Sequence, residues 1–248
     1  MARRKSLAFL DVGQGDCFVA DTKSGAVIFD GGSSSEDQVG RYRILPYMKY
    51  LGYQKIQIAV ISHMDIDHYS GIKELLEMGK IKYLGLPEIP KDETMKKIIG
   101  IAKKRGTTIF YLSRGRQITT KDGSLKVLHP QKNSQMEKNA ASLVMQGKIL
   151  GYRVLLTGDV EKEGEEELLS EELERADILK AAHHGSKNST SNEFLQKVQP
   201  KQTVISCGKQ NRYGHPHLET IHRLQTYRTK IYRTDRSGAI IFFKRRDG

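Results

Sequence analysis

The length and charge of this chain set its first bounds. Its 248 residues predict one large α/β domain or two small ones, and no apolar run approaches the roughly 18 residues that a membrane span needs. Two cysteines make no disulfide framework, and 41 Lys plus Arg against 29 Asp plus Glu give a net charge of +12, which favours a polyanionic partner, nucleic acid first.

Short apolar strands alternate with amphipathic helices along the whole chain. The rhythm predicts two sheets packed face to face and covered by helices, and we expect residues 1–248 to form one domain because no linker divides them. The predicted strands are 7–12, 17–21, 26–29, 56–61, 81–86, 107–112, 125–128, 142–146, 153–156, 178–182, 203–206, one near 231, and 239–243. The predicted helices are 42–51, 71–77, 94–104, 161–175, 193–198 and 218–226.

A dense group of polar side chains follows the apolar strand at 56–61. The segment 63–68 contains His63, Asp65, Asp67 and His68, four potential metal ligands within six residues. A loop just past the end of a strand is where open α/β sheets place their chemistry. Imidazole and carboxylate ligands together suit Zn²⁺, Mn²⁺ or Fe. A plain helix cap is the competing interpretation, but a cap needs only one Asp or Ser.

Three further polar groups stand at strand ends or in a tight turn. Asp159 follows the strand 153–156, His183 and His184 follow 178–182, and His215 lies in a Gly/Pro turn. Taken singly, Asp159 can simply cap the next helix, and the histidines can be surface or capping residues. Together with the segment 63–68 they supply enough nitrogen and oxygen ligands for two metal ions about 3.5–4 Å apart, the spacing of two-metal hydrolases.

The order of these motifs resembles a known family, the metallo-β-lactamase superfamily, and within it the extracytoplasmic nuclease domain of ComEC-type competence DNA-uptake proteins. The matching segments are Leu10-Asp11-Val12-Gly13-Gln14-Gly15-Asp16, Ile28-Phe29-Asp30-Gly31-Gly32, 63–68, 139–144, 155–159, 183–186 and 213–217. The resemblance implies a four-layer αβ/βα sandwich with the metal ions held between the sheet edges.

The resemblance also implies roles for single residues. His63 and Asp65 would hold one ion, and Asp67 and His68 the other. Asp159 resembles the ligand that bridges both ions. His183 resembles the ligand that comes last in the family pattern. Because the two residues are adjacent, sequence spacing leaves His184 as the alternative. His215 resembles the group beside the leaving atom, as a phosphate binder or general acid, with His217 as the competing choice. The expected substrate contacts are His184, Ser186 and His217.

The chain departs from the family pattern at two ligand positions. Asp65 replaces the usual His, and the usual mid-chain His has no counterpart, since His129 is the only histidine between His68 and His183. Asn139 or Ser142 occupies that part of the pattern, so one ion is expected to be bound weakly or through water. Tyr69-Ser70-Gly71 replaces the usual Gly-Gly after the motif.

These features predict a metal-dependent phosphodiester hydrolase with DNA as partner, and the resemblance implies that it degrades one strand during competence DNA uptake. Asp67 and His215 are the expected catalytic residues. Two divalent ions are expected, with Mn²⁺ preferred for the oxygen-rich ligand set and Zn²⁺ possible. The apolar stretch 7–10 is too short for a signal-peptide core, so no signal peptide is expected and the chain is expected to be soluble. It would lie at the extracytoplasmic membrane face, beside the channel segments of a parent protein, if it is an excised domain.

Two other functions fit the same residues. The first is a stand-alone hydrolase of a small phosphodiester, nucleotide or lactone. The second is a nucleic-acid-binding module whose metal site is structural. The oligomeric state is not predicted by any of these patterns.

Overall fold

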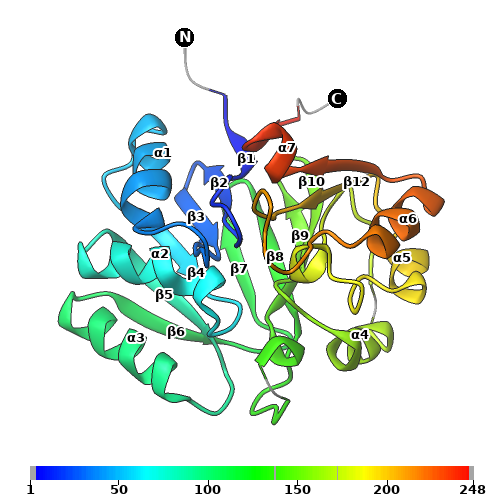
Figure 1. Cartoon of the computed structure of the whole chain (residues 1–248). Helices are drawn as coiled ribbons and strands as arrows, with labels where there is room; N and C mark the ends of the chain where they lie inside the picture. Colours follow the sequence, from blue (N-terminus) through cyan, green and yellow to red (C-terminus); the bar gives the residue numbers. More distant parts are fainter. Residues whose placement is uncertain (1–3, 137, 172, 246–248) are drawn as a thin grey trace.

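Two seven-stranded sheets form the centre of the molecule. The computed structural model describes residues 4–136, 138–171 and 173–245. The strand order is β14-β1-β2-β3-β4-β5-β6 in the first sheet and β13-β12-β11-β10-β9-β8-β7 in the second. Helices cover the outer face of each sheet (Figure 1). Four layers therefore stack in the order helix, sheet, sheet, helix, and the predicted αβ/βα sandwich is confirmed.

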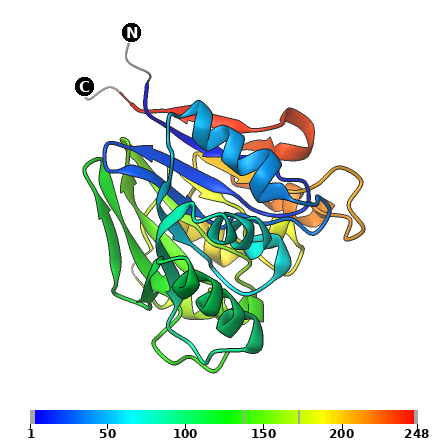
Figure 2. The same cartoon turned by 90° about the vertical axis from the view of Figure 1, so that its left-hand side faces the viewer.

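The first sheet and its helices come mainly from the N-terminal half. Its strands are β1 (Ser6–Phe9), β2 (Phe18–Thr22), β3 (Gly25–Phe29), β4 (Ile56–Val60), β5 (Ile81–Pro87), β6 (Thr108–Leu112) and β14 (Ile240–Phe243). The helices over it are a π-helical turn η1 (Gly40–Ile44) that leads into α1 (Leu45–Tyr50), then α2 (Ile66–Glu77) and α3 (Glu93–Lys104). Figure 2 shows α1, α2 and α3 side by side on this face.

The second sheet and its helices follow in the chain. Its strands are β7 (Gln117–Thr120), β8 (Gly123–His129), β9 (Val144–Ile149), β10 (Tyr152–Leu156), β11 (Ile178–Lys180), β12 (Gln202–Ile205) and β13 (Lys230–Arg233). Three helices cover it, namely α4 (Lys162–Leu169), α5 (Asn192–Val198) and α6 (Leu218–Thr226). Shorter turns are η2 (Lys138–Ala141), η3 (Ala182–Gly185) and α7 (Thr234–Ser237).

The alternation of side chains along each strand explains why the layers stack in this way. In β3, Val27 and Phe29 belong to the core between the sheets, while Ala26 and Ile28 belong to the core beneath the helices. Both faces of the strand are buried, so it reads as a continuous apolar run. A third core lies between the second sheet and its helices, and Phe194 and Leu195 of α5 pack in it.

The start of α2 differs from the sequence prediction. The helix begins at Ile66, five residues before the predicted start at 71, and Asp65 takes the extended conformation of the residue before a helix. Asp67 and His68 therefore lie in the first helical turn and not in a tight loop. A carboxylate in that turn is favourable, because the N-terminal end of a helix carries partial positive charge.

Other boundaries also moved. Helix α4 ends at Leu169, whereas a helix over 161–175 was predicted; residue 172 lies outside the described residues. The predicted helix was longer because charged residues continue beyond Leu169. Leu173 is the next apolar side chain that packs on the core. Strand β7 was not predicted, because its Gln-Ile-Thr-Thr sequence has a single apolar residue. Both cysteines are buried free thiols.

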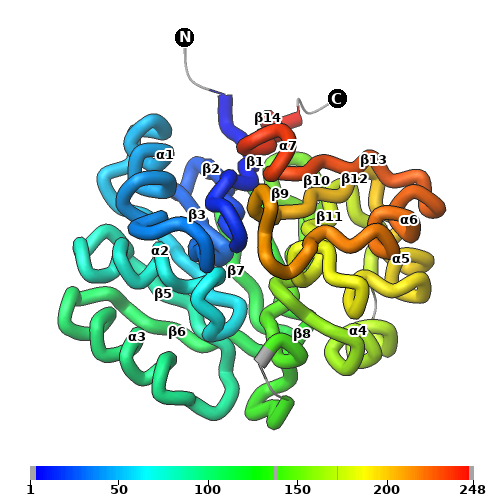
Figure 3. The backbone as a smooth tube through the Cα atoms, viewed as in Figure 1, coloured from blue at the N-terminus to red at the C-terminus, as the bar shows by residue number. Residues whose placement is uncertain are grey.

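The last strand closes the first sheet. β14 pairs antiparallel with β1, with Leu7 opposite Phe242 (Figure 3). The two sheets are therefore not simply the two halves of the sequence. Within the described residues, no helix has the length and apolar character to cross a membrane.

Candidate metal site

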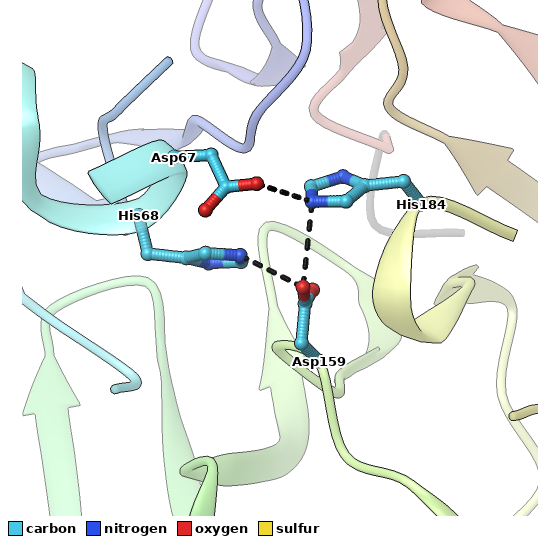
Figure 4. A group of neighbouring side chains, drawn as sticks. All are labelled: Asp67, His68, Asp159 and His184. Atoms are coloured by element: carbon cyan, nitrogen blue, oxygen red, sulfur yellow. Dashed lines mark ion pairs between the residues drawn. The ribbon is translucent and has the colours of Figure 1, made fainter. Parts of the chain in front are cut away.

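Four side chains from both sheets converge at one edge of the sandwich (Figure 4). Asp67 and His68 come from the start of α2, after β4, while Asp159 follows β10 and His184 follows β11. One potential ligand atom from each of the four lies within 4.8 Å of the others. We call these four residues the His/Asp cluster.

Short contacts connect the members of the His/Asp cluster. Asp159 Oδ2 lies 3.1 Å from His68 Nε2 and 3.4 Å from His184 Nε2. Asp67 Oδ2 lies 3.3 Å from His184 Nε2. His68, Asp159 and His184 are buried, and Asp67 faces a cavity of about 250 Å³ that also exposes Asp159 and His184. The cluster therefore forms the floor of an accessible polar cavity.

The two imidazoles are oriented from behind. His68 Nδ1 lies 3.0 Å from Asp30 Oδ2, and His184 Nδ1 lies 2.9 Å from the carbonyl oxygen of Ser206. These contacts turn both Nε2 atoms toward Asp159. Neither Nε2 atom makes a hydrogen bond to the described residues. Metal-binding histidines in proteins are held in this way, with the second ring nitrogen on a carboxylate or carbonyl.

Charge in the cluster favours a bound cation. Burial alone would raise the pKa of Asp159, but His184 and His68 outweigh it and hold this pKa well below its usual value. Burial alone would lower the pKa of His68, but Asp159 and Asp30 raise it well above its usual value. The pKa of His184 is raised in the same way, against burial, by Asp159 and Asp16. Ionised carboxylates and inward nitrogen atoms fit a divalent metal ion.

The backbone on both sides of the site has left-handed residues or close approaches that most side chains do not allow. His183 and His184 have φ of 48° and 53°, a left-handed conformation that is uncommon outside glycine and that clusters at functional sites. Gly185 continues it at φ 83°, and a Cβ there would lie 2.6 Å from Pro216 Cβ. On the other side, a Cβ at Gly32 would lie 2.5 Å from the carbonyl oxygen of Ile66. The Asp-Gly-Gly turn thus packs directly on the start of α2.

A second acidic group lies behind His68. Asp16, Asp30 and His68 could also hold an ion by geometry. Lys180 already occupies this position, however, with its Nζ 2.6 Å from Asp16 Oδ2. Burial alone would raise the pKa of Asp16, but Lys180 and His184 lower it to about 2. This buried pair supports the imidazoles from outside, since Asp16 Oδ1 also lies 3.4 Å from His184 Nδ1.

His63 and Asp65 form a pair beside the cluster. His63 Nε2 lies 3.7 Å from Asp65 Oδ2, and its Nδ1 lies 3.0 Å from Ser62 Oγ. The neighbouring His63 lowers the pKa of Asp65. Asn139 lines a groove together with Asp65, and its buried Oδ1 has no hydrogen-bond partner among the described residues. This pair with Asn139 is the place where a second, weaker site was expected.

Two of the residues singled out in the sequence make local contacts. Ser142 Oγ accepts a hydrogen bond from Asp159 N at 3.3 Å, and so supports the loop that carries this carboxylate. His129 lies away from the cavity, with Nε2 2.7 Å from the carbonyl oxygen of Ala140. The mid-chain histidine of the family pattern is therefore not supplied by His129.

The neighbouring histidines 183 and 184 have different surroundings. His184 belongs to the cluster. His183 lines the cavity, its Nδ1 lies 2.8 Å from Glu161 Oε1, and its Nε2 lies 3.8 Å from Asp159 Oδ2. The structure thus brings the alternative residue, His184, into the group of four. His183 stands at the cavity wall.

The remaining predicted residues lie in the loops above the cavity. Ser186 Oγ accepts from Asn188 N within its own turn, and His217 Nδ1 accepts from Lys187 N at the start of α6. His215 lines the cavity, and its buried Nδ1 has no hydrogen-bond partner among the described residues. Burial, followed by the charges of His184, His183 and His217, lowers the pKa of His215 to about 4.

Sequence reasoning missed Asp30 and Lys180 as supporting residues. Asp30 ends a strand inside the quoted Asp-Gly-Gly motif, and Lys180 interrupts an apolar strand just before the two histidines. A lone charge in a buried strand is a signal of a partner, since buried charges are paired. It does not show which partner.

Known proteins share sequence similarity with this chain. A family model described as the metallo-beta-lactamase superfamily matches residues 10–209, and the chain belongs to that superfamily. It is 37% identical over 259 residues to ComE operon protein 3 of Bacillus subtilis, covering 96% of this chain and 33% of that protein. It is 30% identical over 248 residues to competence protein ComA of Neisseria gonorrhoeae, covering 96% and 32%.

A solved structure shows the same fold. The metallo-beta-lactamase fold protein YhfI of Bacillus subtilis superimposes with a TM-score of 0.63 at 12% identity, covering 97% of this chain and 99% of that chain. The chain spans about a third of the length of the curated relatives it matches. It is thus a hydrolase domain of the metallo-β-lactamase fold, with a buried His/Asp metal site, related to competence proteins.

Proposed function

We propose that this domain is a metal-dependent phosphodiesterase that cleaves DNA. The observation that carries the proposal is the His/Asp cluster, a buried set of nitrogen and oxygen donors contributed by both sheets at the floor of a polar cavity. The net charge of +12 supports a polyanionic substrate. The relationship to competence proteins supports DNA in particular.

The chain offers two metal positions of unequal quality. Asp67, His68, Asp159 and His184 would hold the better-defined ion, with His184 in the role first given to His183. His63 and Asp65 would hold the second ion together with Asp159. When bound, such ions act as Lewis acids that acidify water and neutralise phosphate charge. The carboxylate-rich donor set favours Mn²⁺, with Zn²⁺ as the alternative.

The protein's own groups would position the substrate. Asp67 faces the cavity and can orient the attacking water molecule. His215 lies across the cavity, where its neutral ring can donate a hydrogen bond to a phosphate oxygen; the negative charge of a bound phosphate would raise its lowered pKa toward that of a proton donor for the leaving oxygen. His183 is held by Glu161 at the cavity wall and can contact the same phosphate. Ser186 and His217 keep the loops that carry these rings in place.

The biological setting is part of the same proposal. The domain would work within a larger membrane protein, at the extracytoplasmic face, where it degrades one strand of incoming DNA. The segment 96–116 is rich in Lys and Arg. Its exposed Lys103, Lys104 and Arg105 would contribute to DNA binding. Arg114 is not available for DNA, because it pairs with Glu167 at 2.9 Å and Glu171 at 2.8 Å.

One assay tests the proposal. End-labelled single- and double-stranded DNA is incubated with the chain and Mn²⁺, Zn²⁺, Mg²⁺ or Ca²⁺ in turn, at low and physiological salt. We expect cleavage that needs a divalent metal, stops with EDTA and weakens with salt. Asp67→Asn should abolish it, whereas Asp37→Asn, an exposed carboxylate away from the cavity, should not. Cleavage by metal-free Asp67→Asn protein would contradict the proposal.

The small size of the cavity favours a second candidate, a hydrolase of small phosphodiesters or nucleotides. A volume of about 250 Å³ accommodates a phosphate with little beyond it. The two candidates differ in their response to competition. A small diesterase turns over a chromogenic diester at a rate that excess DNA leaves unchanged, while a nuclease is inhibited by DNA.

A further inference from the structure

An aromatic and cationic stack stands at the rim of the cavity, outside the metal ligands. The Tyr213 ring lies parallel to that of His215, with 22° between the planes and 5.7 Å between the centroids. The Arg212 guanidinium lies over the Tyr213 ring at 4.9 Å and donates to Tyr213 Oη at 2.7 Å. The stack leads from solvent down to the cavity floor.

The loop that carries the stack is fixed by one side chain. Asn211 Oδ1 accepts from His215 N at 3.0 Å, and Asn211 Nδ2 donates to the carbonyl oxygens of Gly208 and His215. The loop is therefore held in shape while its tip stays open to solvent. Tyr213 is 43% exposed, so its ring is accessible to a ligand at the cavity rim.

The opposite rim is also apolar and exposed. Ile66, the first residue of α2, is 54% exposed and lines the same cavity as Arg212, Tyr213 and His215. The cavity mouth thus lies between an aliphatic side chain and an aromatic ring. A flat apolar group that extends from a phosphate on the cavity floor would pass between them.

Charge separates the two approaches to the site. On one side a groove is lined by Asp65, Glu161 and Glu163 against one cation, Lys162, and this net negative charge repels a phosphate backbone. On the other side stands Arg212, which lines the same cavity as Asp67. The guanidinium is therefore within electrostatic reach of the cluster. A polyanion is guided to the Arg212 side.

We propose that Tyr213 stacks against an unpaired nucleobase next to the scissile phosphate, while Arg212 swings from the ring to the adjoining phosphate, so that the site takes single-stranded nucleic acid. Every base offers a flat face, so this contact tolerates any sequence. A base inside a duplex is already stacked and paired, and would have to be flipped out to reach the ring. The inference rests on the proposed function and specifies its substrate.

Binding without turnover tests the inference. Fluorescence anisotropy in EDTA compares a labelled oligothymidylate with an abasic strand of the same length and charge. We expect the wild-type chain to bind the thymidylate strand about 5- to 100-fold more tightly, the value of stacking one base. Tyr213→Ala should bring this ratio close to one, and Tyr213→Phe should keep it. Tyr50→Ala, which removes a still more exposed ring on α1, should leave the ratio unchanged.

Each result decides a different point. The stacking contact is overturned if the wild-type chain binds the two strands with equal affinity. It is also overturned if Tyr213→Ala weakens the binding of both strands by the same factor. The proposed function can also fail separately. If the base preference depends on Tyr213 but the protein cleaves DNA without a metal, the stacking contact is retained and the proposed metal-dependent function is wrong. Circular dichroism of each variant checks that the fold is intact.

Discussion

At the residue scale, two adjacent histidines differ in burial and in the group that holds each Nδ1 atom. His184 is buried, its Nδ1 is held by a carbonyl group, and its Nε2 lies 3.3 Å from Asp67 Oδ2 and 3.4 Å from Asp159 Oδ2. His183 is partly exposed and is held by Glu161. The left-handed backbone at both positions sends the two rings in different directions. A metal ion would depend on one ring and not on the other.

Substituting the two histidines separates these roles. His184→Ala should weaken metal binding by at least about 100-fold, because it removes a donor from the cluster itself, more than the loss of an outer partner costs. His183→Ala should retain the metal and lose turnover. Isothermal titration with Mn²⁺ and a rate measurement on the same preparations check this. A His183→Ala protein without metal, beside a His184→Ala protein with metal, would reverse the assignment.

Asp30 gives a second prediction, about orientation. Its Oδ2 lies 3.0 Å from His68 Nδ1, and its Oδ1 accepts from Ser62 N at 2.7 Å. Asp30→Asn should lower the metal affinity about 10- to 100-fold, as expected for an outer partner of a ligand. Asp235→Asn is the matched control, because Asp235 pairs with Arg233 away from the cluster. An equal loss in both variants would show that the effect is not specific to the site.

The sequence predicts the ligand-type residues better than their supports. Asp67, His68 and Asp159 stand out because polar side chains follow apolar strands. The Asp16–Lys180 pair does not, because it joins a loop of the first sheet to a strand of the second. No local pattern marks such a partner. The choice between His183 and His184 likewise needs the backbone angles, which sequence spacing does not contain.

At the element scale, strands were predicted more accurately than helix ends. Burial on both faces makes β3 a continuous apolar run, and β4 is apolar except for Gln57, so the sequence displays both strands directly. The start of α2 was missed because its first turn is polar and packs against the Asp-Gly-Gly turn, where Gly31 N donates to the carbonyl oxygen of His68. That contact is tertiary. Because a neighbouring turn and not an apolar face determines where α2 begins, the first turn of this helix shows no apolar periodicity in the sequence.

One buried carboxylate ties several elements together. Asp177, just before β11, accepts from Arg153 N of β10 at 3.0 Å. Lys201 lies 2.9 Å and Arg245 3.3 Å from its oxygens. Burial alone would raise the pKa of Asp177, but the bond from Arg153 N and the two cations outweigh it and hold this pKa below its usual value. The junction therefore contributes to stability while the carboxylate is ionised.

Acid should remove that contribution. Because the folded pKa lies below the unfolded one, the stabilisation is fully present above the unfolded pKa and is lost as pH falls through the folded pKa. Asp177→Asn should lower the free energy of unfolding by about 1–3 kcal/mol at neutral pH. The difference from wild type should shrink below about pH 4. Urea unfolding over pH 3–8 measures it.

The control for this series is Glu93→Gln in the exposed pair with Lys96. It should leave the unfolding midpoint nearly unchanged at every pH, because exposed pairs contribute little. A constant difference between Asp177→Asn and wild type down to pH 3 would mean that packing, and not charge, explains the loss.

At the scale of the whole molecule, the site joins the two sheets. Asp67 and His68 belong to the first sheet's elements, and Asp159 and His184 to the second's. The core between the sheets likewise takes side chains from both, such as Phe9 and Leu156. Opening one sheet from the other would break the core and the site together. We therefore propose that residues 1–248 unfold as one unit.

Calorimetry with and without Mn²⁺ tests this coupling. We expect a single transition whose midpoint rises by about 5–10 °C when the ion is present at about 100 times its Kd, from a stabilisation of about 2.7 kcal/mol. His184→Ala should keep the single transition and lose most of the rise. Two separate transitions would contradict one cooperative unit. An undiminished rise in His184→Ala would place the ion elsewhere.

The pairing of β14 with β1 has a consequence for the time course of biosynthesis. Arg4, next to β1, donates to the carbonyl oxygen of Lys244, next to β14, a contact between residues 240 positions apart. A ribosome that adds about 5–20 residues per second takes tens of seconds or less to make that stretch. Throughout this interval one side of β1 has no strand beside it. An unpaired strand edge invites association with other chains. The nascent domain is therefore exposed to aggregation at this edge of β1 until β14 has been made.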